Sequence, residues 1–351
     1  MSYKEIIRGT KKIEIETPEI YVDNEKRGRS GHMTHAMAEF APGCFIDFNS
    51  NCSASRVGGH SPYGWVEYRI SEDCGKTYSD INKLPYSVEC FEDGIHMISV
   101  EKAVCCDDGT IVAFCLRNAG TKEWACEPWD TPVVIRSCDG GKTWSEPLEY
   151  SKYAGRTYGV VYHKGIIYAM HFCNEEFLGK KPEHVYRIYK STDNGKSFKE
   201  LCIVPFETEG RGYCNLIFDN DDKLHAYAYN VNAESMLDHA VSLDFGENWE
   251  VLEPCYLKKF IRNPQLGYID GIYVLHGRAG LSHLVLYTSE DLTNWDAGTY
   301  IVYKEKVGAF YSNNLNLTDE NGNFLLIQYS DAYDNDAKVN VMHTKLRVKD
   351  K

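Results

Sequence analysis

Two arginines stand at the two ends of one predicted hairpin and could together bind a carboxylate. Arg262 opens the stretch RNPQL, and Arg278 closes the stretch HGR of the same hairpin. The planar guanidinium group matches the edge of a carboxylate with two parallel hydrogen bonds. Arg211 is a candidate third member of this group. The competing interpretation is that these arginines form ordinary surface ion pairs.

Histidines are the candidate groups for proton transfer. His60, together with Arg56, lies in the stretch 49–60, which contains no acidic residue. An imidazole has a pKa near 6.5, so it can act as an acid or a base close to neutral pH. Two further histidines precede apolar runs: His96 is a candidate for a catalytic role and His35 for substrate binding.

A repeated unit has to position these residues. The octapeptide SCDGGKTW at 137–144 recurs in related form at 71–78, 191–198 and 242–249, and a degraded copy without the glycine lies at 289–295. The serine and aspartate can accept hydrogen bonds from the amides of a tight turn, and glycine can adopt a positive φ. The final aromatic residue can plug the turn. A spacing of roughly 45 to 65 residues is typical of propeller blades.

The stretches between these turns divide the chain into six blades. Each blade begins with two apolar runs joined by a short turn that contains glycine or aspartate. The alternating stretch 11–16 is predicted to be the outer strand of the last blade, beside 339–343, so that the ring has no open edge. We therefore expect residues 1–351 to form one all-β domain, a six-bladed propeller of four-stranded antiparallel blades. The predicted blades cover residues 32–85, 95–150, 156–205, 211–255, 261–304 and 308–347.

In a propeller, the entrance ends of the innermost strands converge on one site. Polar and aromatic residues gather at these predicted ends: His35, His96, Arg156, Tyr158, Glu209, Arg211, Tyr213, Arg262, Asn263, Tyr311 and Asn313. Arg56 and Arg278 lie close to them in loops and at the ends of second strands, so we expect a binding site for a small carbohydrate here. Aromatic rings can stack on sugar rings, although most of the 25 tyrosines fit a role in the core.

The repeated turn resembles the Asp-box of the sialidase (BNR-repeat) superfamily, and the resemblance covers nearly the whole chain. It implies boxes between the third and fourth strands of each blade, three arginines on the substrate carboxylate, and a nucleophilic tyrosine. Tyr311, within GAFYSN at the start of the last blade, is similar in position to that tyrosine. A phenol needs a carboxylate to take its proton, and Glu209 is the acidic residue best placed by blade order. A tyrosine at a strand start can also make an ordinary hydrogen bond.

Two features depart from the superfamily pattern. The first arginine of the superfamily lies in an Arg-Ile-Pro segment, whereas the corresponding stretch here, 32–37, has the sequence HMTHAM. The acid/base aspartate lies in the following loop, where this chain offers Arg56 and His60. The pattern therefore favours a related reaction on another acidic or neutral sugar. It equally fits elimination from a uronic acid, in which a histidine or tyrosine removes the C5 proton while arginine neutralises the carboxylate.

Composition limits the partners and the location. A formal net charge of −13 argues against binding to nucleic acid or to anionic membrane surfaces, since both need basic patches. The 13 cysteines lack CxxC spacing, and no apolar stretch is typical of a signal or a membrane span, so we expect a cytoplasmic protein. No nucleotide-binding loop, haem motif or metal-ligand spacing is present, so we expect no cofactor and no metal.

Three hypotheses for the function stay open. The first, which the sequence favours, is an exo-acting, sialidase-like glycoside hydrolase that removes a terminal, acidic sugar from a short oligosaccharide. The second is a uronic-acid oligosaccharide lyase on the same scaffold, favoured by His60, His96 and the missing aspartate. The third is a non-catalytic propeller that binds a glycan or a protein.

Overall fold

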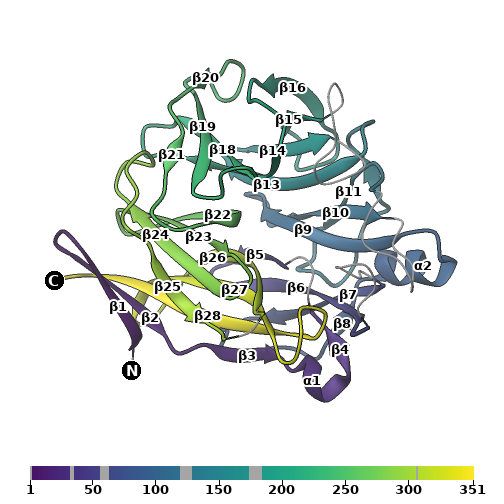
Figure 1. The fold of residues 1–351 in the computed structure, drawn as a ribbon. Helices are drawn as coiled ribbons and strands as arrows, with labels where there is room; N and C mark the ends of the chain where they lie inside the picture. Colours follow the sequence, from purple (N-terminus) through teal and green to yellow (C-terminus); the bar gives the residue numbers. More distant parts are fainter. Residues whose placement is uncertain (1, 32–34, 56–62, 119–128, 174–183, 306) are drawn as a thin grey trace.

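The computed structural model of the protein describes residues 2–31, 35–55, 63–118, 129–173, 184–305 and 307–351. Six sheets surround a central axis as a six-bladed β-propeller, as the sequence predicts (Figure 1). Paired strands within each blade are antiparallel, which suits the short turns that join most of them. The inner strands of neighbouring blades contact one another around the whole ring, including the last and the first.

Each blade contains four strands, counted outward from the axis. The inner strands are β5 (His35–Ala41), β9 (Met97–Cys105), β13 (Gly155–His163), β17 (Arg211–Phe218), β22 (Arg262–Ile269) and β26 (Ala309–Asp319). The second strands are β6 (Cys44–Ser53), β10 (Ile111–Asn118), β14 (Ile166–Cys173), β18 (Leu224–Asn230), β23 (Ile272–Ala279) and β27 (Gly322–Ala332). The third strands are β7 (Gly64–Ser71), β11 (Val133–Ser137), β15 (Val185–Ser191), β19 (Met236–Ser242), β24 (His283–Ser289) and β28 (Val339–Asp350). The outer strands are β8 (Asn82–Lys83), β12 (Leu148–Glu149), β16 (Lys199–Val204), β20 (Glu250–Val251), β25 (Thr299–Tyr303) and β2 (Lys11–Glu16).

Short elements extend this frame. The additional strands are β1 (Ser2–Arg8) beside β2, β3 (Glu19–Val22) beside β28, β4 (Arg29–Ser30) beside β6, and β21 (Cys255–Tyr256) beside β19. The described residues include two helices, α1 (Asn24–Arg27) and α2 (Pro85–Asp93). Helix α2 was not predicted from the sequence. It starts with Pro85, at a position where the missing amide proton costs no hydrogen bond of the helix, and it ends at Gly94 with φ of 69°. In the described part of the chain, no helix has both the length and the apolar character that a membrane crossing requires.

The N-terminal segment closes the ring in the last blade, as predicted, but with a different register. β2 pairs with residues 346–350 of β28, and it is β3 that pairs with 341–343. The prediction that 11–16 lies beside 339–343 is therefore wrong in register. Pro18 has no amide proton and interrupts the pairing between β2 and β3. The alternating pattern of β2 was interpreted correctly, since Ile13 and Ile15 are fully buried in the core.

The five repeated turns share one hydrogen-bond pattern and join the third strand of a blade to the fourth. At 137–144, Gly141 N donates to Ser137 Oγ over 2.8 Å, and Thr143 N donates to Asp139 Oδ1 over 2.9 Å. The copies at 71–78, 191–198 and 242–249 repeat both contacts at 2.7 to 2.9 Å. The degraded copy keeps its serine and aspartate as acceptors, with Leu292 N and Asn294 N as donors.

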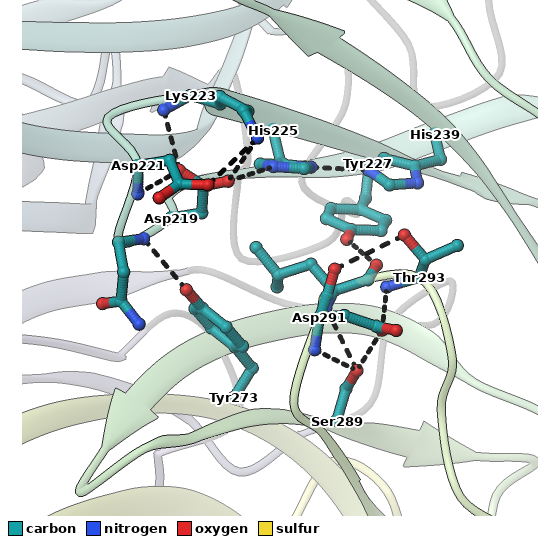
Figure 2. A network of polar contacts seen from close by, with 12 residues as sticks. Asp219, Asp221, Lys223, His225, Tyr227, His239, Tyr273, Ser289, Asp291 and Thr293 are labelled. Carbon is teal, nitrogen blue, oxygen red and sulfur yellow. Dashed lines mark hydrogen bonds and ion pairs between the residues drawn. The ribbon is translucent and has the colours of Figure 1, made fainter.

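The same turns also contact the preceding blade. Tyr68 of blade one donates its hydroxyl proton to Gly141 O over 2.9 Å, and Tyr227 of blade four donates to Leu292 O. Figure 2 shows the second contact, with the turn at Ser289 and Asp291 beside Tyr227 and His239. The box face, which we define as the face that carries these five turns, therefore holds neighbouring blades together.

Candidate functional site

Five of the six inner strands contain a β-bulge between their entrance end and their middle. In β9, β13, β17, β22 and β26 the register with the second strand slips at this point. A bulge adds a residue to one strand and changes the direction of its side chain. The slips include one residue from each of five blades: Glu101, Tyr158, Tyr213, Asn263 and Tyr311.

Contacts between blades join these residues into one cluster. The rings of Tyr158 and Tyr213 have centroids 4.8 Å apart, and Asn263 Nδ2 donates to the Tyr158 hydroxyl over 3.2 Å. The hydroxyl groups of Tyr213 and Tyr311 are hydrogen-bonded to each other. Arg156 and Arg278 also contact the tyrosine rings. The central cluster, as we name it, comprises seven residues that are each at most 5% exposed: Glu101, Arg156, Tyr158, Tyr213, Asn263, Arg278 and Tyr311.

Glu101 neutralises Arg156 inside the central cluster. Arg156 Nε lies 3.1 Å from each carboxylate oxygen of Glu101, and Nη2 contacts the same carboxylate. The guanidinium group also lies against two rings, with centroid distances of 5.1 Å to Trp129 and 5.4 Å to Tyr213. Because both charges are buried, loss of either one would leave the other without compensation.

Arg278 has no such counter-charge. Its guanidinium carbon lies 5.1 Å from the centroid of the Tyr311 ring, and its buried Nε has no hydrogen-bond partner in the part of the chain that the structure describes. No carboxylate of the described residues forms an ion pair with it. A buried cation without an anion is unfavourable by several kcal/mol in order of magnitude. This arrangement is typical of a site that receives an anionic ligand.

A second buried cation lies one residue beyond Glu101 on β9. Lys102 Nζ donates to Asn313 Oδ1 over 2.9 Å and to Gln265 Oε1. Burial lowers the pKa of Lys102 to about 7, so the ammonium form is present in quantity at neutral pH. Among the described side chains no carboxylate pairs with it. Two arginines and a partly protonated lysine are thus buried near the centre of an acidic protein, and Glu101 is the one described carboxylate that pairs with any of them.

Tyr311 has a raised pKa and follows two residues with unusual backbone angles. Burial raises the pKa of its hydroxyl well above the usual value and Tyr213 adds to this, while Arg278 and Arg156 oppose the shift. The hydroxyl is therefore protonated at neutral pH. The two preceding residues, Ala309 and Phe310, have φ of 68° and 56°. Such values cost roughly 1–3 kcal/mol per residue and cluster at functional sites.

Of the predicted arginines, Arg278 lies in the central cluster and Arg262 at its edge. The two are register partners in β22 and β23. Arg262 Nε donates to the Tyr229 hydroxyl over 2.9 Å and lies 3.6 Å from Glu234 Oε1, whereas Arg278 lies over Tyr311. The two guanidinium groups thus contact different rings, and a clamp that uses both stays a prediction.

Arg211 and Glu209 lie on the rim of blade four. Arg211 Nε forms an ion pair with Asp238 Oδ2 over 2.5 Å, which matches the structural alternative for this arginine. Its Nη1 donates to the backbone oxygen of Glu209. The Glu209 side chain is exposed, and its role as the base for Tyr311 stays a prediction.

Among the other predicted residues, the contacts of His96 and Asn313 are with residues outside the central cluster. His96 Nε2 lies 2.9 Å from Asp130 Oδ2 in a half-buried pair. His35 is buried, neither of its ring nitrogens has a hydrogen-bond partner among the described residues, and burial lowers its pKa to about 3. Asn313 uses its amide for Lys102 and for the backbone oxygen of His35. His60 and Arg56 lie outside the described residues.

Sequence reasoning missed Glu101 and Lys102 entirely. Both lie in the run MISVEKAV, which forms the buried strand β9. Two adjacent charges inside an otherwise apolar run were the signal that could have identified them, since buried charges need partners. The pairing of Glu101 with Arg156 could not be inferred, because it depends on the bulge in β9.

Solved structures provide the comparison with known proteins. A protein of unknown function from Dyadobacter fermentans matches 96% of this chain and 99% of its own, with a TM-score of 0.73 and 15% identity. The Hadza microbial sialidase Hz136 follows with a TM-score of 0.66 and 12% identity, over 95% of this chain and 68% of its own. Trypanosoma rangeli sialidase in complex with sialic acid matches with a TM-score of 0.64 and 10% identity, over 94% and 58%. The chain has the propeller fold of sialidases.

Sequence comparisons add no relative. Neither a scan against models of protein families nor a search of curated protein sequences finds a match. The structural likeness therefore concerns the fold, and the chain spans 58% of the length of the trypanosomal sialidase.

Proposed function

We propose that this protein is a sialidase-like glycoside hydrolase that removes a terminal acidic sugar from a short oligosaccharide, with Arg278 binding the sugar carboxylate. The observation that carries this proposal is the buried, unpaired Arg278 beside Tyr311. The additional charge of Lys102 favours an anionic ligand further. An overall charge of −13 makes this local excess of positive charge distinctive.

Tyr311 is the proposed nucleophile. Its oxygen would bond to the anomeric carbon as the glycosidic bond breaks, and water would then release the sugar with the tyrosine restored. Burial raises the pKa of Tyr311, and Arg278 and Arg156 oppose that rise only in part, so the reaction needs a base that accepts the tyrosine proton. Glu209 remains the proposed acceptor of that proton.

Elimination from a uronic acid is the second candidate. The hydrogen bond between the Tyr213 and Tyr311 hydroxyl groups, beside Arg278, favours it. In that reaction a tyrosine oxygen that has first lost its own proton to a base takes the C5 proton, the C4 substituent leaves with the electrons of its bond to C4, and a C4–C5 double bond forms. The arginine stabilises the charge that develops on the carboxylate.

Proton NMR of the protein with a panel of sialosides and uronic-acid oligosaccharides tests both candidates. A new reducing-end anomeric signal identifies a hydrolase, and a vinylic proton signal identifies a lyase. Line broadening without new signals identifies a protein that only binds the sugar. Either reaction should stop in Tyr311→Phe, and Glu209→Gln tests the proposed base.

A matched control keeps this result specific. Tyr162→Phe removes a hydroxyl that accepts a hydrogen bond from Asp107 N on the opposite face, so its activity should equal that of the natural protein. If Tyr311→Phe and Tyr162→Phe are equally active, Tyr311 has no part in the chemistry.

A cytoplasmic location also remains part of the proposal. The eleven cysteines that the structure describes with their side chains are all free, which supports a reducing compartment.

A further inference from the structure

A cavity of about 410 Å³ lies on the flank of the propeller, where the N-terminal segment closes the ring. Its walls come from β3, β7, the first box turn and β28, and it shares no lining residue with the central cluster. The residues that matter for its chemistry are Tyr21, Arg69, Tyr78 and His343. We refer to it as the flank cavity.

A buried carboxylate orients one wall of the flank cavity. His343 Nε2 lies 2.9 Å from Oδ2 of the fully buried Asp47, and His343 Nδ1 lies 3.2 Å from the Tyr78 hydroxyl. Gln328 donates to the other oxygen of Asp47. The Tyr21 ring stacks on the imidazole with centroids 4.0 Å apart and planes 14° apart. The wall is therefore flat, and its polar groups have fixed directions.

Two further donor atoms of the flank cavity have no hydrogen-bond partner among the described residues. They are Arg69 Nε and the Tyr21 hydroxyl, which are both buried. The described carboxylates form no ion pair with Arg69, whose guanidinium carbon lies 5.5 Å from the centroid of the Tyr21 ring. Tyr21 is 9% exposed, and burial raises the pKa of its hydroxyl, so it stays a donor. A buried donor without an acceptor costs about 1–3 kcal/mol. Both groups are therefore hydrogen-bond donors that lack an acceptor among the described residues.

The other charged groups around the flank cavity limit what fits. Lys76 is paired with Glu320 at 2.7 Å, and Glu16 lies 3.4 Å from Arg347. Glu19 also lines the cavity and disfavours a large, highly charged anion. A guanidinium group binds the edge of a carboxylate or a phosphate, and a tyrosine hydroxyl can complete the contact.

We propose that the flank cavity is a second ligand site, which binds the oxyanion group of a small molecule, a carboxylate or a phosphate, between Arg69 and the Tyr21 hydroxyl. The site joins β7 of the first blade to β3 of the N-terminal segment. Ligand binding therefore stabilises ring closure. The proposal is independent of the reaction at the central cluster.

Histidine-selective NMR tests it on the whole protein, with acetate and inorganic phosphate titrated separately at ionic strength matched by chloride. The His343 signal, assigned with His343→Gln, should move and saturate with at least one of the two anions. Arg69→Gln should weaken this binding about tenfold or more, and Tyr21→Phe about threefold to tenfold. Arg278→Gln is the matched control and should leave it unchanged, because Arg278 lies outside the cavity.

The anion that binds identifies the ligand chemistry: acetate alone indicates a carboxylate, phosphate alone a phosphate ester, and both a general oxyanion site. Absence of a saturable shift with either anion would overturn the proposal. An unchanged affinity in Arg69→Gln would do the same. Should Arg69→Gln not fold, Tyr21→Phe decides, since it removes one hydroxyl and keeps the stacked ring. Activity at the central cluster plays no part in any of these outcomes.

Discussion

The box face and the central cluster differ in whether their polar groups have hydrogen-bond partners. In the box turns, Ser137 and Asp139 accept hydrogen bonds from amides of their own turn, and each other copy does the same. In the central cluster, Arg278 Nε and Asn263 Oδ1 have no partner among the described residues. A face that satisfies its own polar groups stabilises the fold, whereas a face that leaves some unsatisfied is suited to a ligand.

The two regions also differ in how they use the backbone. The boxes repeat one local turn, with Gly140 and its counterparts Cys74, Asn194, Phe245 and Leu292 at positive φ. The central cluster uses five different bulges, and opposite one of them only glycine fits, since a Cβ on Gly277 would lie 2.6 Å from Arg262 O. Repetition thus marks the structural face, and irregularity marks the site.

Acid should destabilise the protein more than any single substitution, while the hydrogen bonds of the box turns persist. Burial lowers the pKa of four histidines to about 3 or 4: His35, His171, His239 and His276. The unfolded chain protonates them below about pH 6.5, so stability is complete above that pH and falls as the pH decreases. Each contributes a loss of up to about 2 kcal/mol by pH 5. Hydrogen bonds from Thr143 lower the pKa of Asp139 to about 2, so its turn keeps these hydrogen bonds until the pH approaches 2, and its contribution to stability begins to fall only below about pH 4.

Urea unfolding between pH 7.5 and 5 measures this effect. His239→Gln replaces the buried histidine shown in Figure 2. It should reduce the slope of the free energy of unfolding against pH by the contribution of one proton. A free energy of unfolding that stays constant over this range would contradict the assignment of neutral buried histidines.

Removal of the buried carboxylate of the central cluster should have the next largest effect. Glu101→Gln leaves the Arg156 guanidinium buried without its counter-ion, so the free energy of unfolding should fall by about 3–5 kcal/mol. The matched control is Glu149→Gln, whose side chain is 57% exposed and pairs with Arg117 at 2.7 Å. This control should lose less than about 1 kcal/mol. If denaturant unfolding shows equal losses for the two variants, the buried ion pair contributes no more to stability than the exposed one.

A change in a box turn should destabilise the fold and leave ligand binding intact. Asp139→Ala removes the acceptor for Thr143 N and Thr143 Oγ1, and should cost about 1–2 kcal/mol, the range of a lost cap. Thermal unfolding and sugar titration of the same sample would show both sides of this prediction. Weaker sugar binding at an unchanged melting temperature would contradict the separation of the two faces.

Arg278→Gln should weaken ligand binding and leave the fold intact. It removes a buried charge without a counter-ion, so the melting temperature should stay the same or rise. The affinity for a carboxylated sugar should fall about tenfold, equal to about 1.4 kcal/mol. Arg262→Gln, at the edge of the cluster, should weaken binding less. If Arg278→Gln unfolds the protein and binding persists in the folded fraction, Arg278 is a structural residue.

Local patterns of the chain were sufficient for the architecture. The number of blades, the box turns and the strand at 11–16 were predicted because each leaves a pattern in residues close together in sequence. The register of β2 was not, because β28 is twelve residues long and offers more than one alignment. Helix α2 was missed because nine residues show too little periodicity between two blades.

The site was recovered only in part, for a related reason. All residues of the central cluster except Glu101 were among the predicted ones, because they stand at or near strand ends, where the propeller brings side chains from different blades together. Glu101 and its contact with Arg156 were not, since the direction of a bulged side chain depends on the register between two strands. The conformation of the box turns is determined by hydrogen bonds between residues a few positions apart. The arrangement of charges at the centre depends on which distant side chains the tertiary structure buries together.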